Sequence, residues 1–226
     1  MENKLRLRFS KADTLRYIGH LDFLRVFMQT IRRSCLPIAY SQGFNPHQII
    51  SFALPLPLGM ESVHDYVDIT LTKDLLYERI CWSLNCVAPV GLHILDVYKA
   101  KGKPAASATT VADYLVDVGA ASGTHTTDGS ASLQMKISEI LSAETLIIPK
   151  KTKSGVKNTD IRPDIFDIRV EDNALFLRLS AGSSRFLNPT LVTNLLYEGI
   201  GEKPCVSAMS RLELYRTGDN GEIVRL

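Results

Sequence analysis

The chain has 226 residues, of which 45% are hydrophobic and 22% are charged. These values are ordinary for a globular protein, and the length allows one large domain or two small ones. No apolar run approaches the roughly 18 residues of a membrane helix, and the N-terminus lacks the apolar region of a secretion signal. A net charge of +2 indicates no class of partner by itself. We expect a cytoplasmic protein without a membrane segment.

The first half of the chain predicts the order strand, helix, strand, strand, helix, strand. Residues 4–9 alternate charged and apolar side chains, as a half-buried strand does. Residues 20–35 change to helical spacing, with an apolar stripe that begins at Leu21, and Pro37 ends this helix. A second helix follows Thr72, which can cap it. Further strands are expected at residues 38–41, 49–54, 66–71 and 92–98.

The second half repeats this order in a looser form. Residues 101–107 (KGKPAAS) are polar, small and rich in helix breakers, which predicts a linker. One strand is in excess, and a basic loop is expected to reach Pro163. Asn188 and Pro189 form a good cap and first turn for the last helix. Strands are expected at residues 111–118, 145–148, 166–170, 175–179 and 206–215, and helices near 133–141 and 189–199.

These patterns predict the fold class and the domains. The expected fold is α+β, with two packed ferredoxin-like (split βαβ) units, of which the second is elaborated. The first domain would cover residues 1–104 and carry the motifs described next, and the second, divergent domain would cover residues 105–226.

The densest local motif lies at residues 40–47 (YSQGFNPH) and continues into residues 51–59 (SFALPLPLG). We expect Gly43 to adopt a backbone angle that other residues resist, while Pro46 stiffens the return of the chain. Such fixed geometry between two apolar runs favours a recognition loop. A rigid turn that only positions two strands is the alternative. The candidate contact residues of the loop are Gln42, Phe44, Asn45 and His47.

Three segments resemble a bacterial family of radical-SAM-associated domains of unknown function (DUF2344-like). They are residues 15–22 (LRYIGHLD), the loop motif, and residues 65–68 (DYVD), with a weaker echo at residues 160–163 (DIRP). Members of that family occur alone or fused behind a cobalamin-binding radical SAM module, often encoded beside ribosomal-protein and ribonuclease genes. The resemblance implies an RNA- or translation-linked role beside a radical SAM protein. Where members usually read His-Pro-Lys, this chain reads His47-Gln48-Ile49, which removes the expected cation from the loop.

Two zones of the sequence are basic. Residues 1–50 hold eight Lys or Arg against three Asp or Glu, and residues 150–163 hold five against one. Such zones on a nearly neutral protein indicate RNA or another anionic partner, although solvated surface charge is an equal alternative. We expect salt-sensitive RNA binding through cations of both zones, and Arg185 is a further candidate. These cations are Arg25, Arg32, Lys150, Lys151 and Arg162.

The start of the first predicted helix is a candidate phosphate site, since a helix N-terminus favours anions. Its residues are Lys11, Arg16, Tyr17 and His20. His20 or His47 could act as the base of an RNA endonuclease of the tandem ferredoxin-like type. A histidine before a helix is more often a cap or a packing residue. We expect Arg16, His20, Gln42, Asn45 and His47 to converge on one concave site.

The sequence predicts that this chain binds no cofactor or metal. The histidines lack zinc-motif spacing, and the four cysteines lack cluster spacing and suit buried, reduced thiols. A radical SAM partner would carry the iron–sulfur cluster, S-adenosylmethionine and cobalamin. Three functions remain open: an accessory RNA-linked substrate-binding module, a metal-independent RNA endonuclease, and a protein–protein adaptor that docks through residues 54–58 (LPLPL).

Overall fold

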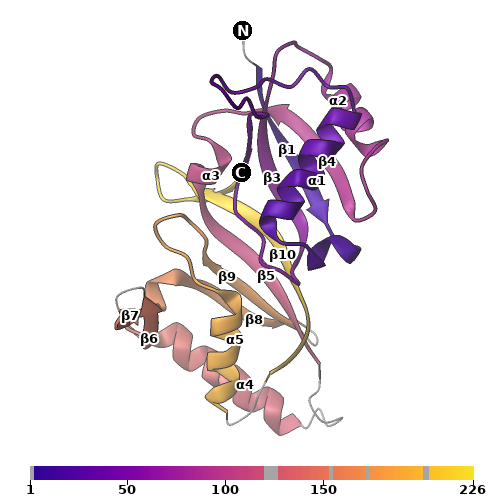
Figure 1. The fold of residues 1–226 in the computed structure, drawn as a ribbon. Coiled ribbons are helices and arrows are strands. Elements are labelled where there is room, and N and C mark those ends of the chain that lie inside the picture. Colours follow the sequence, from indigo (N-terminus) through magenta and orange to yellow (C-terminus); the bar gives the residue numbers. More distant parts are fainter. Residues whose placement is uncertain (1–2, 120–126, 153–154, 172–173, 201–203) are drawn as a thin grey trace. The chain divides into compact units, whose positions relative to one another are not determined.

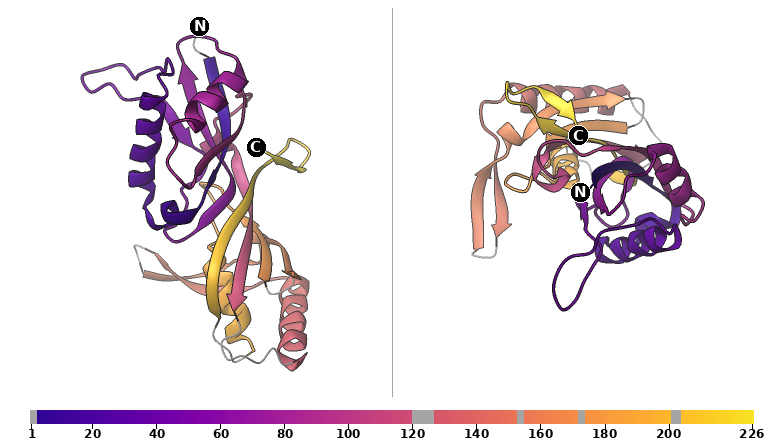
Figure 2. Two further views of the ribbon diagram at one scale, coloured as in Figure 1. Left: turned by 90° about the vertical axis from the view of Figure 1, so that its right-hand side faces the viewer. Right: turned by 90° about the horizontal axis from the view of Figure 1, so that it is seen from above.

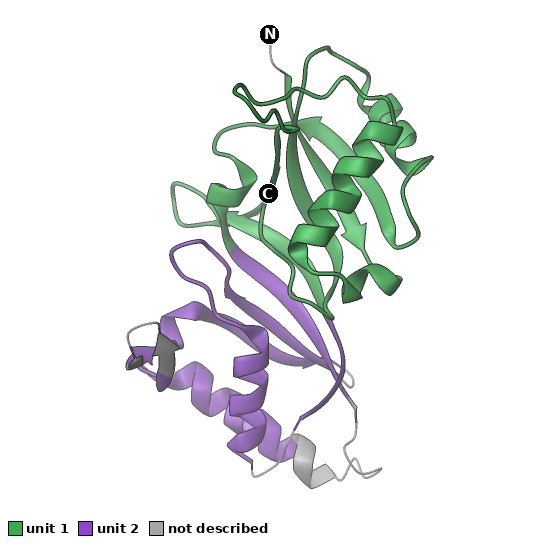
Figure 3. Ribbon diagram, viewed as in Figure 1, with its two compact units in different colours: residues 1–110, 210–226 green, residues 111–209 purple. Residues whose placement is uncertain are grey.

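The computed structural model describes residues 3–119, 127–152, 155–171, 174–200 and 204–226, with side chains except at 119, 127–130, 150–152 and 155–157. The fold contains both helices and a mixed β-sheet. Two compact units are present, and Figure 3 colours them separately. Unit 1 comprises residues 1–110 and 210–226, and unit 2 comprises residues 111–209. The C-terminal residues 210–226, which we expected in the second domain, therefore belong to unit 1 by their contacts.

The sheet of unit 1 is built around β1 (Asn3–Lys11). This strand pairs antiparallel with β3 (Glu61–Leu71) on one side and with β4 (Leu92–Lys99) on the other (Figure 1). The short β2 (Ile50–Phe52) pairs antiparallel with β3. The second half of β10 (Cys205–Thr217) runs parallel to β3 through Ser210 and Arg211, and β11 (Ile223–Arg225) pairs with β10.

Two helices cover one face of this sheet. They are α1 (His20–Arg33) and α2 (Tyr77–Asn85), and their buried residues share one core cluster with alternate residues of β1, β3 and β4. On α1 the row Phe23, Phe27 and Ile31 is buried, each four residues after the last. The predicted stripe was wrong at its start, because Leu21 is 68% exposed. The row of Phe23, Phe27 and Ile31 contains two phenylalanines, so it buries more apolar area than a row that begins at Leu21.

The short elements of unit 1 correct two further expectations. Thr72 does not cap α2, which begins at Tyr77, because its hydroxyl donates to the Pro37 carbonyl. The expected linker contains a helical turn, α3 (Ala105–Ala108), and Ala105 is fully buried. Between β1 and α1 lies the short 3-10 helix η1 (Asp13–Tyr17).

Unit 2 contains the antiparallel strand order β5–β9–β8. These strands are β5 (Thr109–Gly119), β8 (Ile165–Glu171) and β9 (Ala174–Ser180), with helices α4 (Thr127–Ser142) and α5 (Pro189–Glu198). The Asn188 cap is confirmed, since its side-chain oxygen accepts from the Thr190 amide. The segment between the strands expected at residues 166–170 and 175–179 includes residues 172–173, which lie outside the described residues. Figure 2 gives two further views.

The expected basic loop is a β-hairpin in the structure. Strand β6 (Ile147–Thr152) pairs antiparallel with β7 (Gly155–Asp160), and the 3-10 helix η2 (Arg162–Asp164) follows. The lysines in this stretch favoured a loop, but the backbone pairing of β6 and β7 does not depend on the side chains that carry the charge. No helix in the described ranges is long and apolar enough to cross a membrane.

Candidate functional site

The candidate site residues of unit 1 lie near the two ends of α1. His20 and Arg33 lie roughly 20 Å apart along the helix, given a rise of about 1.5 Å per residue. The pocket end lies around His20, and the loop end lies around Arg33 and residues 41–47. Figure 2 shows the loop projecting from the end of α1 opposite to η1.

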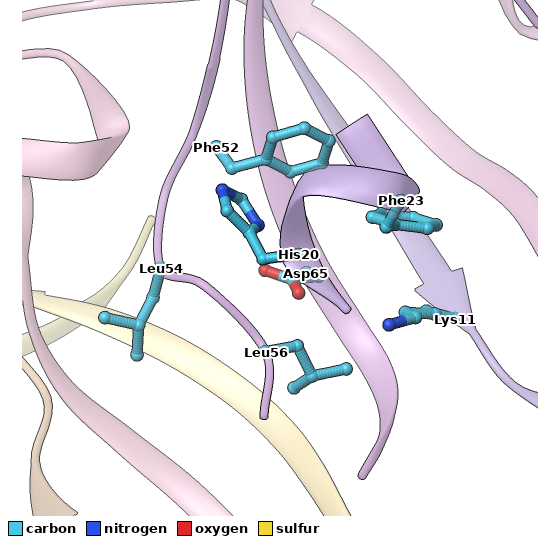
Figure 4. A pocket seen from close by; sticks show the side chains of 7 residues that line it. All are labelled: Lys11, His20, Phe23, Phe52, Leu54, Leu56 and Asp65. Carbon is cyan, nitrogen blue, oxygen red and sulfur yellow. The ribbon is translucent and has the colours of Figure 1, made fainter. Parts of the chain in front are cut away.

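A small pocket lies beneath the first turn of α1. Its volume is about 10 Å³, enough for roughly one water molecule. Figure 4 shows three titratable side chains and four apolar ones around it. The lining residues are Lys11, His20, Phe23, Phe52, Leu54, Leu56 and Asp65.

Lys11 is a buried cation at the end of β1, only 1% exposed. Its ammonium donates to the Ile18 carbonyl at 3.2 Å and lies 4.7 Å from the centre of the Phe23 ring. Burial lowers the pKa of Lys11, and the charge of Arg211 lowers it further, while Asp65 acts in the opposite direction. Among the described residues, no carboxylate forms a salt bridge with Lys11.

Asp65 and Arg211 form a fully buried ion pair. The Arg211 guanidinium donates to the Asp65 carboxylate at 2.6 Å and to the Leu54 carbonyl at 2.9 Å. The other Asp65 oxygen accepts from the Tyr66 amide at 2.9 Å. Burial raises the pKa of Asp65, and the pairing with Arg211 offsets part of this rise. Arg211 thus joins β10, β3 and the segment after β2.

His20 is the first residue of α1, and its ring lies edge-on to Phe52 with 5.5 Å between centroids. Burial lowers the pKa of His20, and the cations Lys11 and Arg211 act in the same direction against Asp65. Together these effects favour the neutral imidazole. A ring fixed by an aromatic neighbour fits the packing interpretation that the sequence left open.

Arg16 and Tyr17 lie outside the pocket lining. Arg16 pairs with Glu61 at 3.1 Å, and its guanidinium lies 4.8 Å from the centre of the Tyr17 ring. The Arg16 carbonyl accepts from the Gly59 amide, so η1 holds the end of the proline-rich segment. That segment serves as a wall of the pocket, although Leu58 remains 68% exposed.

The loop of residues 41–47 has a fixed base and an exposed tip. At the base the Ser41 hydroxyl accepts from the His47 amide and lies 2.9 Å from the His47 Nδ1 atom. Gln48 anchors the returning chain by donating to the Met28 carbonyl of α1 at 3.4 Å. Gly43 has φ +119°, which confirms its expected backbone. At the tip, Phe44 is fully exposed.

Exposed cations gather around the loop end. The carboxyl ends of α1, β3 and β4 and the amino end of β1 meet there, since Asn3 pairs with Leu71 and the Ala100 amide donates to the Lys4 carbonyl. Within the described chain these cations form no salt bridge, and the acids of the same strand ends, turns and first turn of α2 are Asp74 and Glu78. The seven cations are Lys4, Arg32, Arg33, Lys73, Lys99, Lys101 and Lys103.

The expected convergence on one concave site is not found. His20 lies at the pocket end, whereas Gln48 fixes the loop beside Met28, roughly 12 Å further along α1. The sequence grouped the two segments because both flank the same short sheet, but α1 separates its two ends. His47 is bonded to Ser41 at the base of the loop, and Gln42 and Asn45 are exposed near its tip.

The candidates of unit 2 have mostly structural contacts. The Arg162 guanidinium donates to the carbonyls of Leu141 and Ile165, so it ties η2 to α4 and β8. Arg185 pairs with the nearly buried Asp164 at 2.7 Å. Lys150 and Lys151 lie on β6, and their side chains are outside the described part of the chain. On α1, Arg25 pairs with Asp22.

The cysteine expectation was wrong in part. All four thiols are free, but Cys35, Cys86 and Cys205 are exposed rather than buried. Each lies at or beyond the end of an element, where an apolar sequence neighbourhood does not ensure burial. In the described ranges no group of three or more His, Cys, Asp or Glu side chains could hold a metal ion.

Sequence reasoning missed the role of two site residues, Asp65 and Arg211. The sequence signal that could have identified Arg211 is its place in the alternation of a predicted strand. Its partner Asp65, however, lies 146 residues away in the sequence. Strand alternation identifies a face, but it does not say which face is buried or which distant strand pairs with it.

The fold and the pocket define a mixed α and β protein with a buried polar cluster under one helix. The chain belongs to a bacterial family described as "Uncharacterized protein conserved in bacteria (DUF2344)", which matches residues 4–189. The match includes Lys11, His20 and Asp65 and ends before Arg211. A search of curated proteins found no match.

Proposed function

We propose that this chain is an accessory module that binds RNA, or an RNA-linked substrate, at the loop end of unit 1 and presents it to a separately encoded radical SAM protein. The observation that carries the RNA proposal is that seven exposed cations and the exposed Phe44 ring belong to the same end of unit 1. The radical SAM partner is supported by the family resemblance of residues 15–22, 40–59 and 65–68.

The two kinds of contact have different roles in this proposal. Lysine and arginine side chains neutralise phosphates, and each such contact to a single strand contributes about −0.7 to the slope of log K against log salt. An aromatic ring such as Phe44 stacks on an unpaired base, which contributes about 1–3 kcal/mol per base. The tip needs little ordering on binding, because Ser41, His47 and Gln48 already fix the base of the loop.

The strand order supports a ferredoxin-like interpretation of unit 1. The succession β1, α1, β2, β3, α2, β4 with the sheet order β4–β1–β3–β2 is consistent with the split βαβ arrangement. In this arrangement both helices cover one face and the loops gather at the two ends. The loop end of unit 1 is one of these two gathering points.

The endonuclease alternative has no supporting observation here. His20 faces a pocket of about 10 Å³, whereas a base that activates a ribose hydroxyl must reach the sugar. The adaptor alternative is favoured only by the exposed Leu58, since Leu54 and Leu56 line the pocket.

The test is RNA binding measured over a series of salt concentrations with a fluorescent single-stranded oligonucleotide. Arg32→Glu/Arg33→Glu should weaken binding at least tenfold at low salt and flatten the salt slope by about one unit or more. Arg216→Glu, compared with Arg32→Glu alone, is the matched control, because both single variants change the net charge equally at an exposed arginine and Arg216 lies outside the loop end. Equal losses from these two single variants, or no binding by the parent protein, would contradict the proposal.

The partnership needs a separate experiment. Co-purification from the native host, with and without ribonuclease, should recover a radical SAM protein together with this chain. Loss of that protein on ribonuclease treatment would indicate that RNA bridges the two. Recovery of neither the protein nor RNA would contradict the accessory role.

A further inference from the structure

The pocket supports a second inference that does not depend on the loop end. Three titratable side chains from three elements face the same small volume: Lys11 from β1, His20 from α1 and Asp65 from β3 (Figure 4). The other walls are aromatic or aliphatic. An apolar pocket with a few converging titratable groups is typical of a reaction site.

Lys11 is the group whose environment is hardest to explain by packing alone. Within the described part of the chain its ammonium donates one hydrogen bond, to the Ile18 carbonyl, and lies over the Phe23 ring, while the nearby Asp65 is bonded to Arg211. Burial without a carboxylate partner of its own disfavours the charged form, so a larger fraction of this amine is unprotonated at a given pH than of an exposed lysine. Burial and Arg211 lower the pKa of Lys11 accordingly. A neutral amine carries a free lone pair, which makes it a nucleophile.

We propose that Lys11 is a nucleophilic amine that forms an imine with formaldehyde, the smallest aldehyde, in this pocket. The lone pair of its Nζ atom adds to the carbonyl carbon, and one proton moves from nitrogen to oxygen to give a carbinolamine. The hydroxyl of that adduct then leaves with a proton as water, and the carbon–nitrogen double bond forms. The step needs no oxidant or reductant.

The other pocket residues have roles that follow from their places. Asp65 and His20 face the same volume as Lys11 and can transfer the protons that the addition and the loss of water require. Arg211 holds the Asp65 carboxylate and keeps a positive charge near the amine. The volume of about 10 Å³ restricts the substrate to a carbonyl group with little attached.

The test uses the unmodified protein, formaldehyde as the probe and cyanoborohydride to trap the imine. Limiting formaldehyde at pH 7 is followed by peptide mass spectrometry of each lysine. Lys11 should be methylated at least ten times faster than Lys99 and Lys101, although it is 1% exposed and they are exposed. A rate for Lys11 equal to or below theirs, as expected for an inert buried lysine, would overturn the proposal.

Two controls link the reactivity to the folded pocket. In denaturant Lys11 should no longer be methylated faster than Lys99 and Lys101. If it is still methylated faster, the local sequence causes the reactivity, and the proposal of a reactive pocket is overturned. His20→Gln should slow the labelling of Lys11 severalfold in the folded protein and leave Lys99 unchanged. An unchanged rate at Lys11 in that variant would remove His20 from the proton transfer.

Discussion

The two ends of unit 1 hold charges in opposite ways. At the loop end seven cations are exposed and solvated, and the aromatic ring of Phe44 points into water. At the pocket end Lys11, Asp65 and Arg211 are buried, and each charge is constrained by its neighbours. Exposed charges contribute little to stability and are available to a partner, whereas a buried charge that loses its partner lowers stability. Burial also alters the pKa values of Lys11 and Asp65. The two ends therefore respond differently to substitution, salt and pH.

The largest expected effect is at the buried pair. Arg211→Met leaves the Asp65 carboxylate buried without its partner, which should reduce the free energy of unfolding by about 3–5 kcal/mol. Urea unfolding of the single variants and of Asp65→Asn/Arg211→Met measures this. The double variant should be more stable than Arg211→Met, because no uncompensated charge remains. A double variant that is less stable than Arg211→Met would show that the pair does not act as a unit.

The next effect tests how the pocket end is assembled. Gly91 has φ +89°, its carbonyl accepts from the Ala12 amide, and an added Cβ would lie 2.3 Å from the Ala12 carbonyl oxygen. Gly91→Ala therefore adds a backbone clash to the strain of a positive φ, and we expect a loss of more than about 2 kcal/mol. Gly102→Ala is the control, since φ is +71° there and the added Cβ meets nothing within 4 Å. Equal losses in thermal unfolding would contradict the clash.

The third prediction concerns pH. Because the pKa of Lys11 is lowered in the folded protein, the unfolded chain binds more protons at this site between the lowered value and 10.5. The free energy of unfolding should therefore rise with pH across that window and level off above it. Lys11→Met should flatten the rise in urea unfolding between pH 7 and 10. An identical rise in the variant would assign the pH dependence to other groups.

The sequence predicted β1, α1, β2, β3, α2 and β4 of unit 1 because strand alternation and helical spacing are local signals. The strand expected at residues 38–41 was wrong, since only isolated bridges at Ile38 and Tyr40 are present. The sequence also predicted the backbone of Gly43 and the Asn188 cap, which depend on a few adjacent residues. It could not predict that residues 210–226 return to unit 1 or that Arg211 meets Asp65, because such pairing depends on distant segments. The supposed convergence of His20 and His47 failed for the same reason, since proximity to one sheet does not specify which end of it.

The smallest effect on stability, and the clearest on binding, is expected at Phe44. The fully exposed ring makes no packing contribution that its removal could cost, so Phe44→Ala should change the free energy of unfolding by less than about 0.5 kcal/mol. If the ring stacks on a base, the same variant should weaken single-stranded RNA binding by about 1–3 kcal/mol without changing the salt slope. Fluorescence anisotropy over a salt series measures the RNA affinity and its salt slope.

His47→Ala is the comparison, because it opens the base of the loop while keeping the Phe44 ring. It should weaken RNA binding less than Phe44→Ala does. A flatter salt slope in Phe44→Ala would mean that the ring positions the cations rather than contacts a base.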